Sequence, residues 1–90
     1  MNELVGTEKQ VKWANAIRAE KMRLIEADLN TFFSQGRKQL SDGKLSQAQF
    51  DQTVTTLETA KAKVASQTAA TWWIDRRETL PRKLLQEMAR

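Results

Sequence analysis

The chain has 90 residues, which is enough for one domain with a modest core. It contains no cysteine and no histidine, and this excludes disulfides, thiolate and imidazole catalysis and nearly all zinc sites. Its 15 basic and 11 acidic residues leave a net charge of +4. This mild excess is compatible with an acidic protein or a nucleic acid as partner and requires neither.

The N-terminus lacks the basic and then apolar pattern of a secretion signal. No apolar run approaches the roughly 20 residues that a membrane-spanning helix needs. We therefore expect a soluble, cytoplasmic protein with no membrane contact.

The first helix has a clear start signal. Residues 1–6 are expected to be a loose lead-in, with Leu4 and Val5 able to pack against the core, and Thr7 is the expected N-cap. Gln10 follows three residues later and completes a capping box, in which each side chain bonds to the backbone of the other residue.

Apolar residues then recur with the helical period as far as Leu40. Leu40 keeps the phase of the residues before Gly36, which indicates that the helix continues through this glycine. This predicts one long helix over 8–41, with Gly43 near its C-cap. The apolar stripe covers roughly half of the circumference, so we expect the helix to contact more than one neighbour. Those neighbours are either later helices or a second copy of the chain.

A second helix is predicted over 47–66. Ser46 and Gln49 form another capping box, while Leu45 and Phe50 have the spacing of a hydrophobic staple. The short turn before this helix predicts that it packs antiparallel to the first.

The sequence after the second helix has two interpretations. Either the helix continues, or it breaks at 66–68 and restarts as a third helix over 69–78, with Ser66 or Thr68 as cap. The apolar stripe changes phase at Trp72, which favours the break.

Pro81 marks the last boundary, because proline is favoured at the first position of a helix. We expect a final helix over 81–89 that packs through Leu84, Leu85 and Met88. No alternating strand pattern is found. The fold class is therefore a small all-α helical bundle formed by a single domain over 1–90.

The three tryptophans divide between core and surface. We expect Trp13 to lie in the core. Trp72 and Trp73 are about 100° apart on a helix, so at most one of them can point fully inward. Trp73 is assigned to a partner-binding surface, because exposed tryptophan is typical of interface hot spots.

Two charged residues, Arg18 and Asp28, fall within the apolar stripe of the first helix and need partners from elsewhere in the fold. Asp75 is the best candidate to pair with Arg18. Arg76 or Arg77 is the candidate to pair with Asp28. Such pairs would fix the register of the helices.

Basic residues gather near the C-terminus and at positions 37–38, and each cluster has two possible roles. A solvated basic face is the simpler one. Contact with phosphates or with a partner protein is the other. The residues concerned are Arg76, Arg77, Arg82 and Lys83, with Arg90, and a second cluster of Arg37 and Lys38.

Catalysis and metal binding have little support. Segment 38–49 resembles part of a calcium-binding loop, but Lys38, Leu40 and Gln49 occupy the positions of its main oxygen ligands. No phosphate-binding motif and no carboxylate cluster is found. We expect no enzymatic activity, no cofactor and no metal.

Two motifs near the ends of the chain suggest a biological context. One is Gly6-Thr7-Glu8-Lys9-Gln10-Val11-x-Trp13-Ala14-x-x-Ile17-Arg18, and the other is Trp72-Trp73-Ile74-Asp75-x-Arg77. Together they resemble small proteins and appended domains of phages and mobile elements. The resemblance implies that the two motifs pack together. It carries no assigned activity and no site residues.

The main functional hypothesis is a non-catalytic interaction protein of phage or mobile-element type. It would bind a host or phage protein and block a host defence complex, such as a CRISPR effector, by covering its surface. The alternative is a nucleic-acid-binding accessory factor without sequence specificity. A lesser alternative is a homo-oligomer that binds a small anionic ligand at Arg18 or Arg77.

Overall fold

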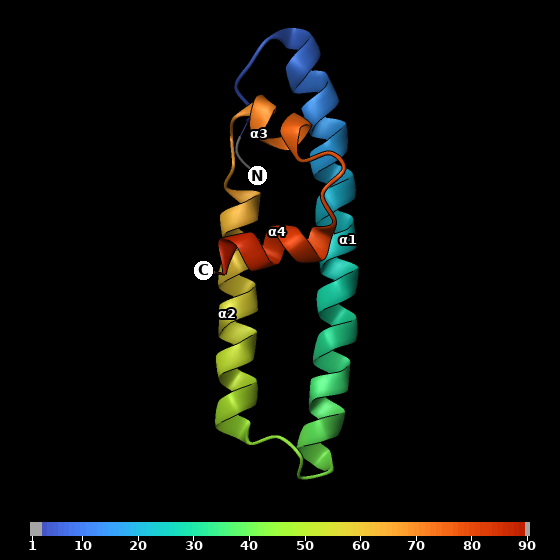
Figure 1. The fold of residues 1–90 in the computed structure, drawn as a ribbon, viewed down its shortest axis with the longest axis vertical. Coiled ribbons are helices and arrows are strands. Elements are labelled where there is room, and N and C mark those ends of the chain that lie inside the picture. The colour runs from blue at the N-terminus through green and yellow to red at the C-terminus, as the bar shows by residue number, and fades with distance from the viewer. Residues whose placement is uncertain (1–2, 90) are drawn as a thin grey trace.

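A computed structural model describes residues 3–89 as four α-helices, with no β-strand in that range (Figure 1). The helices are α1 (Glu8–Ser41), α2 (Gln47–Ala65), α3 (Ala70–Asp75) and α4 (Pro81–Met88). The protein is a small all-α bundle in which α1 and α2 run antiparallel. The expectations for residues 1, 2 and 90 lie outside the described residues.

Local capping sets both ends of α1. The Thr7 hydroxyl accepts the N–H of Gln10 at 3.2 Å, and the Gln10 side chain accepts the N–H of Thr7 at 3.0 Å. After the helix, Gly43 adopts a φ of +74°. The N–H groups of Gly43 and Lys44 donate to carbonyls in the last turn of α1, which is the Schellman arrangement.

The start of α2 follows the same chemistry. The Ser46 hydroxyl accepts the N–H of Gln49 at 3.1 Å, and the Gln49 side chain accepts the N–H of Ser46 at the same distance. Phe50, in the first turn, lies against Gly36 of α1. Helix α1 therefore continues through its glycine, which leaves room for an aromatic ring from α2.

The chain breaks between α2 and α3, as the phase shift of the apolar stripe predicts. The expected caps, Ser66 and Thr68, are wrong. Ala69 is the N-cap of α3, and it makes no side-chain cap bond. The N–H of Ala70 donates instead to the carbonyl of Val5 at 2.8 Å. A residue far away in the sequence thus replaces the local cap.

The same bonds correct the expectation of a loose lead-in for residues 3–6. The N–H of Val5 donates to the carbonyl of Thr68 at 2.7 Å, so a short parallel bridge joins the lead-in to the start of α3. Leu4 is buried in the core, as expected, whereas Val5 is exposed. Backbone pairing and apolar burial together hold this segment in place.

The two C-terminal helices are slightly shorter than expected. Helix α3 ends at Asp75 rather than at residue 78, and α4 ends at Met88 rather than at residue 89. Pro81 occupies the first turn of α4, and Leu80 before it has the extended backbone that proline imposes on its predecessor.

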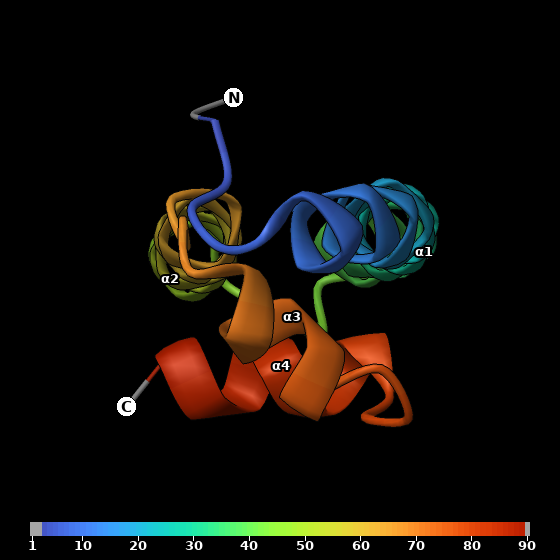
Figure 2. The same cartoon turned by 90° about the horizontal axis from the view of Figure 1, so that it is seen from above.

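Helices α1 and α2 form one layer, and α3 and α4 pack on the same face of it (Figure 2). Helix α4 crosses both long helices near their middle (Figure 1). The core lies where the layers meet. Its buried apolar residues are Leu4, Ala14, Ile25, Leu29, Ala60, Val64, Ala70, Trp73, Leu84 and Leu85.

The other half of the hairpin has almost no core. Between residues 30 and 59, Gly36 is the only buried residue. Large apolar side chains are frequent there, but each remains at least partly accessible to solvent. The bundle is therefore closed at the α3 end and open towards the turn at 42–46.

Candidate interaction surfaces

An accessible tryptophan and an arginine form a contact at the closed end of the molecule. The indole of Trp13 is 50% exposed. The guanidinium carbon of Arg77 lies 5.3 Å from the centre of the Trp13 ring, within the range of a cation–π interaction. Arg77 also donates to the carbonyl of Ile74 at 2.8 Å. The end of α3 thus holds this arginine over the tryptophan of α1.

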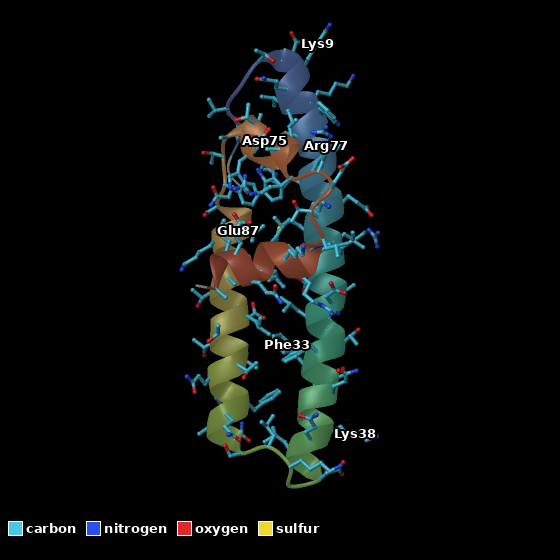
Figure 3. The ribbon with its side chains drawn as sticks, in the orientation of Figure 1. Lys9, Phe33, Lys38, Asp75, Arg77 and Glu87 are labelled. Atoms are coloured by element: carbon cyan, nitrogen blue, oxygen red, sulfur yellow. The ribbon has the colours of Figure 1, made fainter. Side chains whose placement is uncertain are left out.

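Lys9 lies one helical turn before Trp13, on the same side of α1. Figure 3 labels Lys9 and Arg77 at this end of the molecule. We call Lys9, Trp13 and Arg77 the Trp13 patch. It combines an accessible aromatic ring with two positive charges and no acidic member.

The assignment of Trp73 to a partner-binding surface is corrected by its burial. Trp73 has no solvent exposure, and its indole N–H donates to the carbonyl of Gln67 at 3.0 Å. Trp72 packs edge-to-face on it with ring centres 4.8 Å apart, and Trp72 is partly exposed. Adjacent helical residues point about 100° apart, so only one of Trp72 and Trp73 is fully buried. The buried member is Trp73 and the partly exposed member is Trp72.

Trp13 is likewise not the core residue that was expected. Its ring lies beside the end of α3, whose six residues are too few to cover it. The two terminal motifs do pack together, since α1 contacts α3. The Trp13–Arg77 contact is one of the places where they meet.

The expected Arg18–Asp75 pair is not formed. Within residues 3–89 no ion pair joins them, and the buried Arg18 donates to Asn15 at 3.0 Å. Asp75 is exposed at the end of α3. A carboxylate in contact with water avoids the desolvation that a buried pair would require.

Asp28 makes no ion pair with Arg76 or Arg77 among the described residues either. Arg76 is bound to Glu87 at 3.2 Å, and its guanidinium carbon lies 4.3 Å from the ring centre of Trp72. It joins α3 to α4 and is therefore a structural residue. Asp28 is exposed on α1.

The basic residues do not form one surface. Arg77 lies at the closed end, whereas Lys38 lies near the turn at the other end of a molecule 51 Å long (Figure 3). Arg37 also belongs to the turn half and donates to Ser34 at 3.2 Å. Arg82 and Lys83 are exposed on α4, between these ends. The fold therefore separates the two basic clusters.

A cleft of about 710 Å³ lies between α1 and α2 beside α4. Its apolar wall comprises Leu29, Phe32, Leu57 and Leu85. Its polar residues are mostly amides and hydroxyls, namely Thr31, Gln35, Gln52, Thr53, Thr56 and Gln86, together with Asp28 and Arg82. Sequence reasoning missed this cleft. Its only signal was the wide apolar stripe of α1.

Glu20 and Arg23 form an exposed ion pair on α1. The Arg23 side chain donates to the exposed carboxylate of Glu20, and this hydrogen bond lowers the pKa of Glu20. Among residues 3–89, no group of three or more potential ligand residues is placed to hold a metal ion. None of the helices in that range is both long and apolar enough to cross a membrane.

Comparisons with known proteins found no matching family model, no matching curated protein and no matching solved structure.

Proposed function

We propose that the protein is a non-catalytic interaction protein that binds an acidic surface of a partner protein through the Trp13 patch. The observation that carries this proposal is the Trp13–Arg77 contact. It presents a half-exposed indole and an exposed guanidinium side by side.

Tryptophan and arginine are the residues most enriched among interface hot spots. A half-exposed tryptophan leaves apolar area that a partner can remove from water. Arg77 has five N–H donors and uses one of them on Ile74, so it keeps donors for a carboxylate. Because α3 already orders this side chain, binding costs less side-chain entropy.

The charge of the patch favours an acidic partner. Lys9 and Arg77 are both positive, and the chain as a whole carries +4. This combination steers the approach of a negatively charged surface and disfavours basic ones. An elongated molecule attached in this way covers part of its partner, and covering a surface can inhibit without any catalytic step.

The more specific proposal is that the partner belongs to a host defence complex such as a CRISPR effector. Its support is the resemblance of the two terminal motifs to phage and mobile-element proteins. It is tested by expressing the chain in bacteria that carry defined defence systems and measuring the plating efficiency of phage. We expect the wild-type chain to restore the plating of phage on the defended bacteria. The Trp13→Ala and Arg77→Ala variants should not restore it.

The matched control is Phe32→Ala, which removes a ring of similar exposure (48%) far from the patch. It should behave as wild type. Unchanged plating with every defence system, together with no protein retained by the immobilised chain, would contradict the proposal. If the Trp13 and Phe32 variants lost the restored plating equally, the Trp13 patch would not be the binding surface.

Nucleic-acid binding is a second candidate, because a base can stack on the exposed Trp13 ring while Arg77 contacts a phosphate. The separation of the two basic clusters argues against one continuous phosphate-binding face. Fluorescence anisotropy with labelled single strands tests it. Affinity that falls steeply with salt and quenching of Trp13 would support this function.

The lesser alternative, a small anionic ligand at Arg18 or Arg77, meets one obstacle. Arg18 is buried and already donates to Asn15. Native mass spectrometry of the purified protein is the direct test. An added mass that is lost in Arg77→Ala would support this alternative.

A further inference from the structure

The half of the α1–α2 hairpin nearest the turn, residues 30–59, is called the open half. It is rich in large apolar side chains that the fold does not bury. Residues 30–59 include the large apolar residues Phe32, Phe33, Leu40, Leu45, Phe50, Val54 and Leu57, and none of them is buried. Helical segments in proteins take most of their stability from burying an apolar face. A pair of helices as open as this one is expected to be covered by another element.

The uncovered surface has a defined place. Helix α4 lies across α1 and α2, and the cleft begins beside it at Asp28, Arg82 and Leu85. Phe32 is in the cleft lining and is 48% exposed. The surface continues along both helices towards the turn, where Phe50 and Leu45 line a smaller hollow.

We propose that this cleft is the interface of a homodimer, in which a second copy packs its own open half against it in antiparallel orientation. Each turn at 42–46 then approaches α4 of the other copy. The open halves of α1 and α2 from both copies together form a four-helix bundle.

Charge is the first argument for a second copy. The chain carries +4, so two copies repel each other over most of their surface. The cleft lining is the exception: it contains one acidic residue, Asp28, and one basic residue, Arg82, and is otherwise uncharged. Two copies can therefore meet there without accumulating charge of one sign.

Hydrogen-bonding chemistry is the second argument. A two-fold interface places the same surface on both sides, so the surface must be complementary to itself. Amides and hydroxyls meet this condition because each of them both donates and accepts. Four of the polar lining residues are of this kind, namely Thr31, Gln35, Gln52 and Gln86. The hydroxyls of Thr53 and Thr56 donate to carbonyls of α2 and add acceptors to the lining.

The two charged residues give the orientation. Asp28 and Arg82 line the same cleft from different helices, and no ion pair joins them within one chain among the described residues. In the antiparallel dimer both residues lie opposite the turn at 42–46 of the second copy, where the exposed Asp42 and Lys44 supply one charge of each sign, and the two-fold axis makes each such contact occur twice. This proposal concerns the open half and is independent of partner binding by the Trp13 patch.

The first test is the molar mass in solution, measured by sedimentation equilibrium between about 1 µM and about 1 mM, a range that covers weak to moderate affinities. Wild type should dimerise within this range. Phe32→Glu should raise the dissociation constant at least about a hundredfold, because it places a carboxylate in the apolar centre of the contact. Trp13→Glu is the matched control and should dimerise like wild type.

A second variant guards against loss of folding in Phe32→Glu. Gln35 and Gln52 are both exposed, and lysine has a similar helix propensity to glutamine. The double variant Gln35→Lys/Gln52→Lys should keep the circular dichroism spectrum of wild type and remain monomeric, since like charges would face each other across the two-fold axis.

The geometry is tested with spin labels on single cysteines, which the natural chain lacks. Labels at Gln35→Cys should lie close together in the dimer. Labels at Lys9→Cys should lie farther apart than the 51 Å length of one chain, because the closed ends point in opposite directions.

Three results would overturn the proposal. The first is a wild-type chain that remains monomeric at the highest concentration. The second is a dimer in which the Gln35 labels are far apart or the Lys9 labels are close. The third is a monomer that binds an apolar dye in a Phe32-dependent way, which would assign the cleft to a different occupant.

Discussion

The ring of Phe50 lies against Gly36, so closely that a methyl group on Gly36 would come within 2.6 Å of Cε2 and 2.9 Å of Cδ2. Gly36 is inside a long helix, where glycine costs about 1 kcal/mol relative to alanine. The contact explains why a glycine is useful there. It lets an aromatic ring of α2 approach the backbone of α1 in the half of the hairpin that has little other packing.

This contact predicts a change of sign in a double-mutant cycle. In wild type, Gly36→Ala should lower the free energy of unfolding by about 1 kcal/mol, because overpacking of about 1–3 kcal/mol exceeds the gain in helix propensity. In a Phe50→Ala background the same substitution should stabilise by about 1 kcal/mol, since only the propensity gain remains. Urea unfolding followed by circular dichroism measures both values. Destabilisation in both backgrounds would contradict this reading.

The cap of α2 is predicted to contribute measurably to stability. Ser46→Ala removes the hydroxyl that accepts the N–H of Gln49, and it should cost about 1 kcal/mol. Thr55→Ala, at an exposed position inside α2, is the control and should raise stability by a few tenths of a kcal/mol through helix propensity, an estimate from host–guest scales. Thermal unfolding of the two variants should therefore shift in opposite directions.

Two tryptophans of different burial should respond differently to the same substitution. Trp73→Ala empties a fully buried site and removes the bond to Gln67, so we expect a loss of about 3–5 kcal/mol. Trp13→Ala removes a half-exposed ring and its contact with Arg77, for which we expect about 1 kcal/mol. Similar losses in the two variants would show that Trp13 is buried in solution.

The Glu20–Arg23 pair predicts one pH effect. The hydrogen bond from Arg23 lowers the pKa of Glu20 below its ordinary value of 4.5. The stabilising contribution of the carboxylate is therefore fully present above pH 4.5 and is lost as the pH falls through the lowered pKa. Both side chains are exposed, so the contribution is small and screened by salt.

Nuclear magnetic resonance titration of the Glu20 carboxyl carbon measures this pKa directly. Arg23→Ala should raise it towards the ordinary value, and high salt should do the same in wild type. A titration curve that does not change when Arg23 is replaced would contradict the assignment of the cause.

Local signals allowed most helix ends to be predicted. The caps at Thr7 and Ser46, the glycine at position 43 and Pro81 each act through residues within a few positions, so the sequence alone contains the whole interaction. The cap of α3 is the counterexample. Its partner is the carbonyl of Val5, more than sixty positions away along the chain, and no local pattern indicates it.

The candidate site was predictable only in part. The two motifs pack together as expected, and one of Trp72 and Trp73 is buried. Which one it is depends on the direction in which α3 leaves the break. The Arg18–Asp75 pair was inferred from the need of a buried charge for a partner, but that need does not identify the partner.

The sequence by itself determined most helix ends, apart from those of α3, and that the chain forms an all-α hairpin with two short helices added. These properties follow from hydrogen bonds and periodicities over a few residues. Only the tertiary structure decided that Trp13 faces solvent beside Arg77, that Trp73 is buried, and that a cleft remains between α1 and α2. Each of these depends on where α3 packs on α1 and where α4 crosses the hairpin, and both places are set by packing between residues distant in sequence.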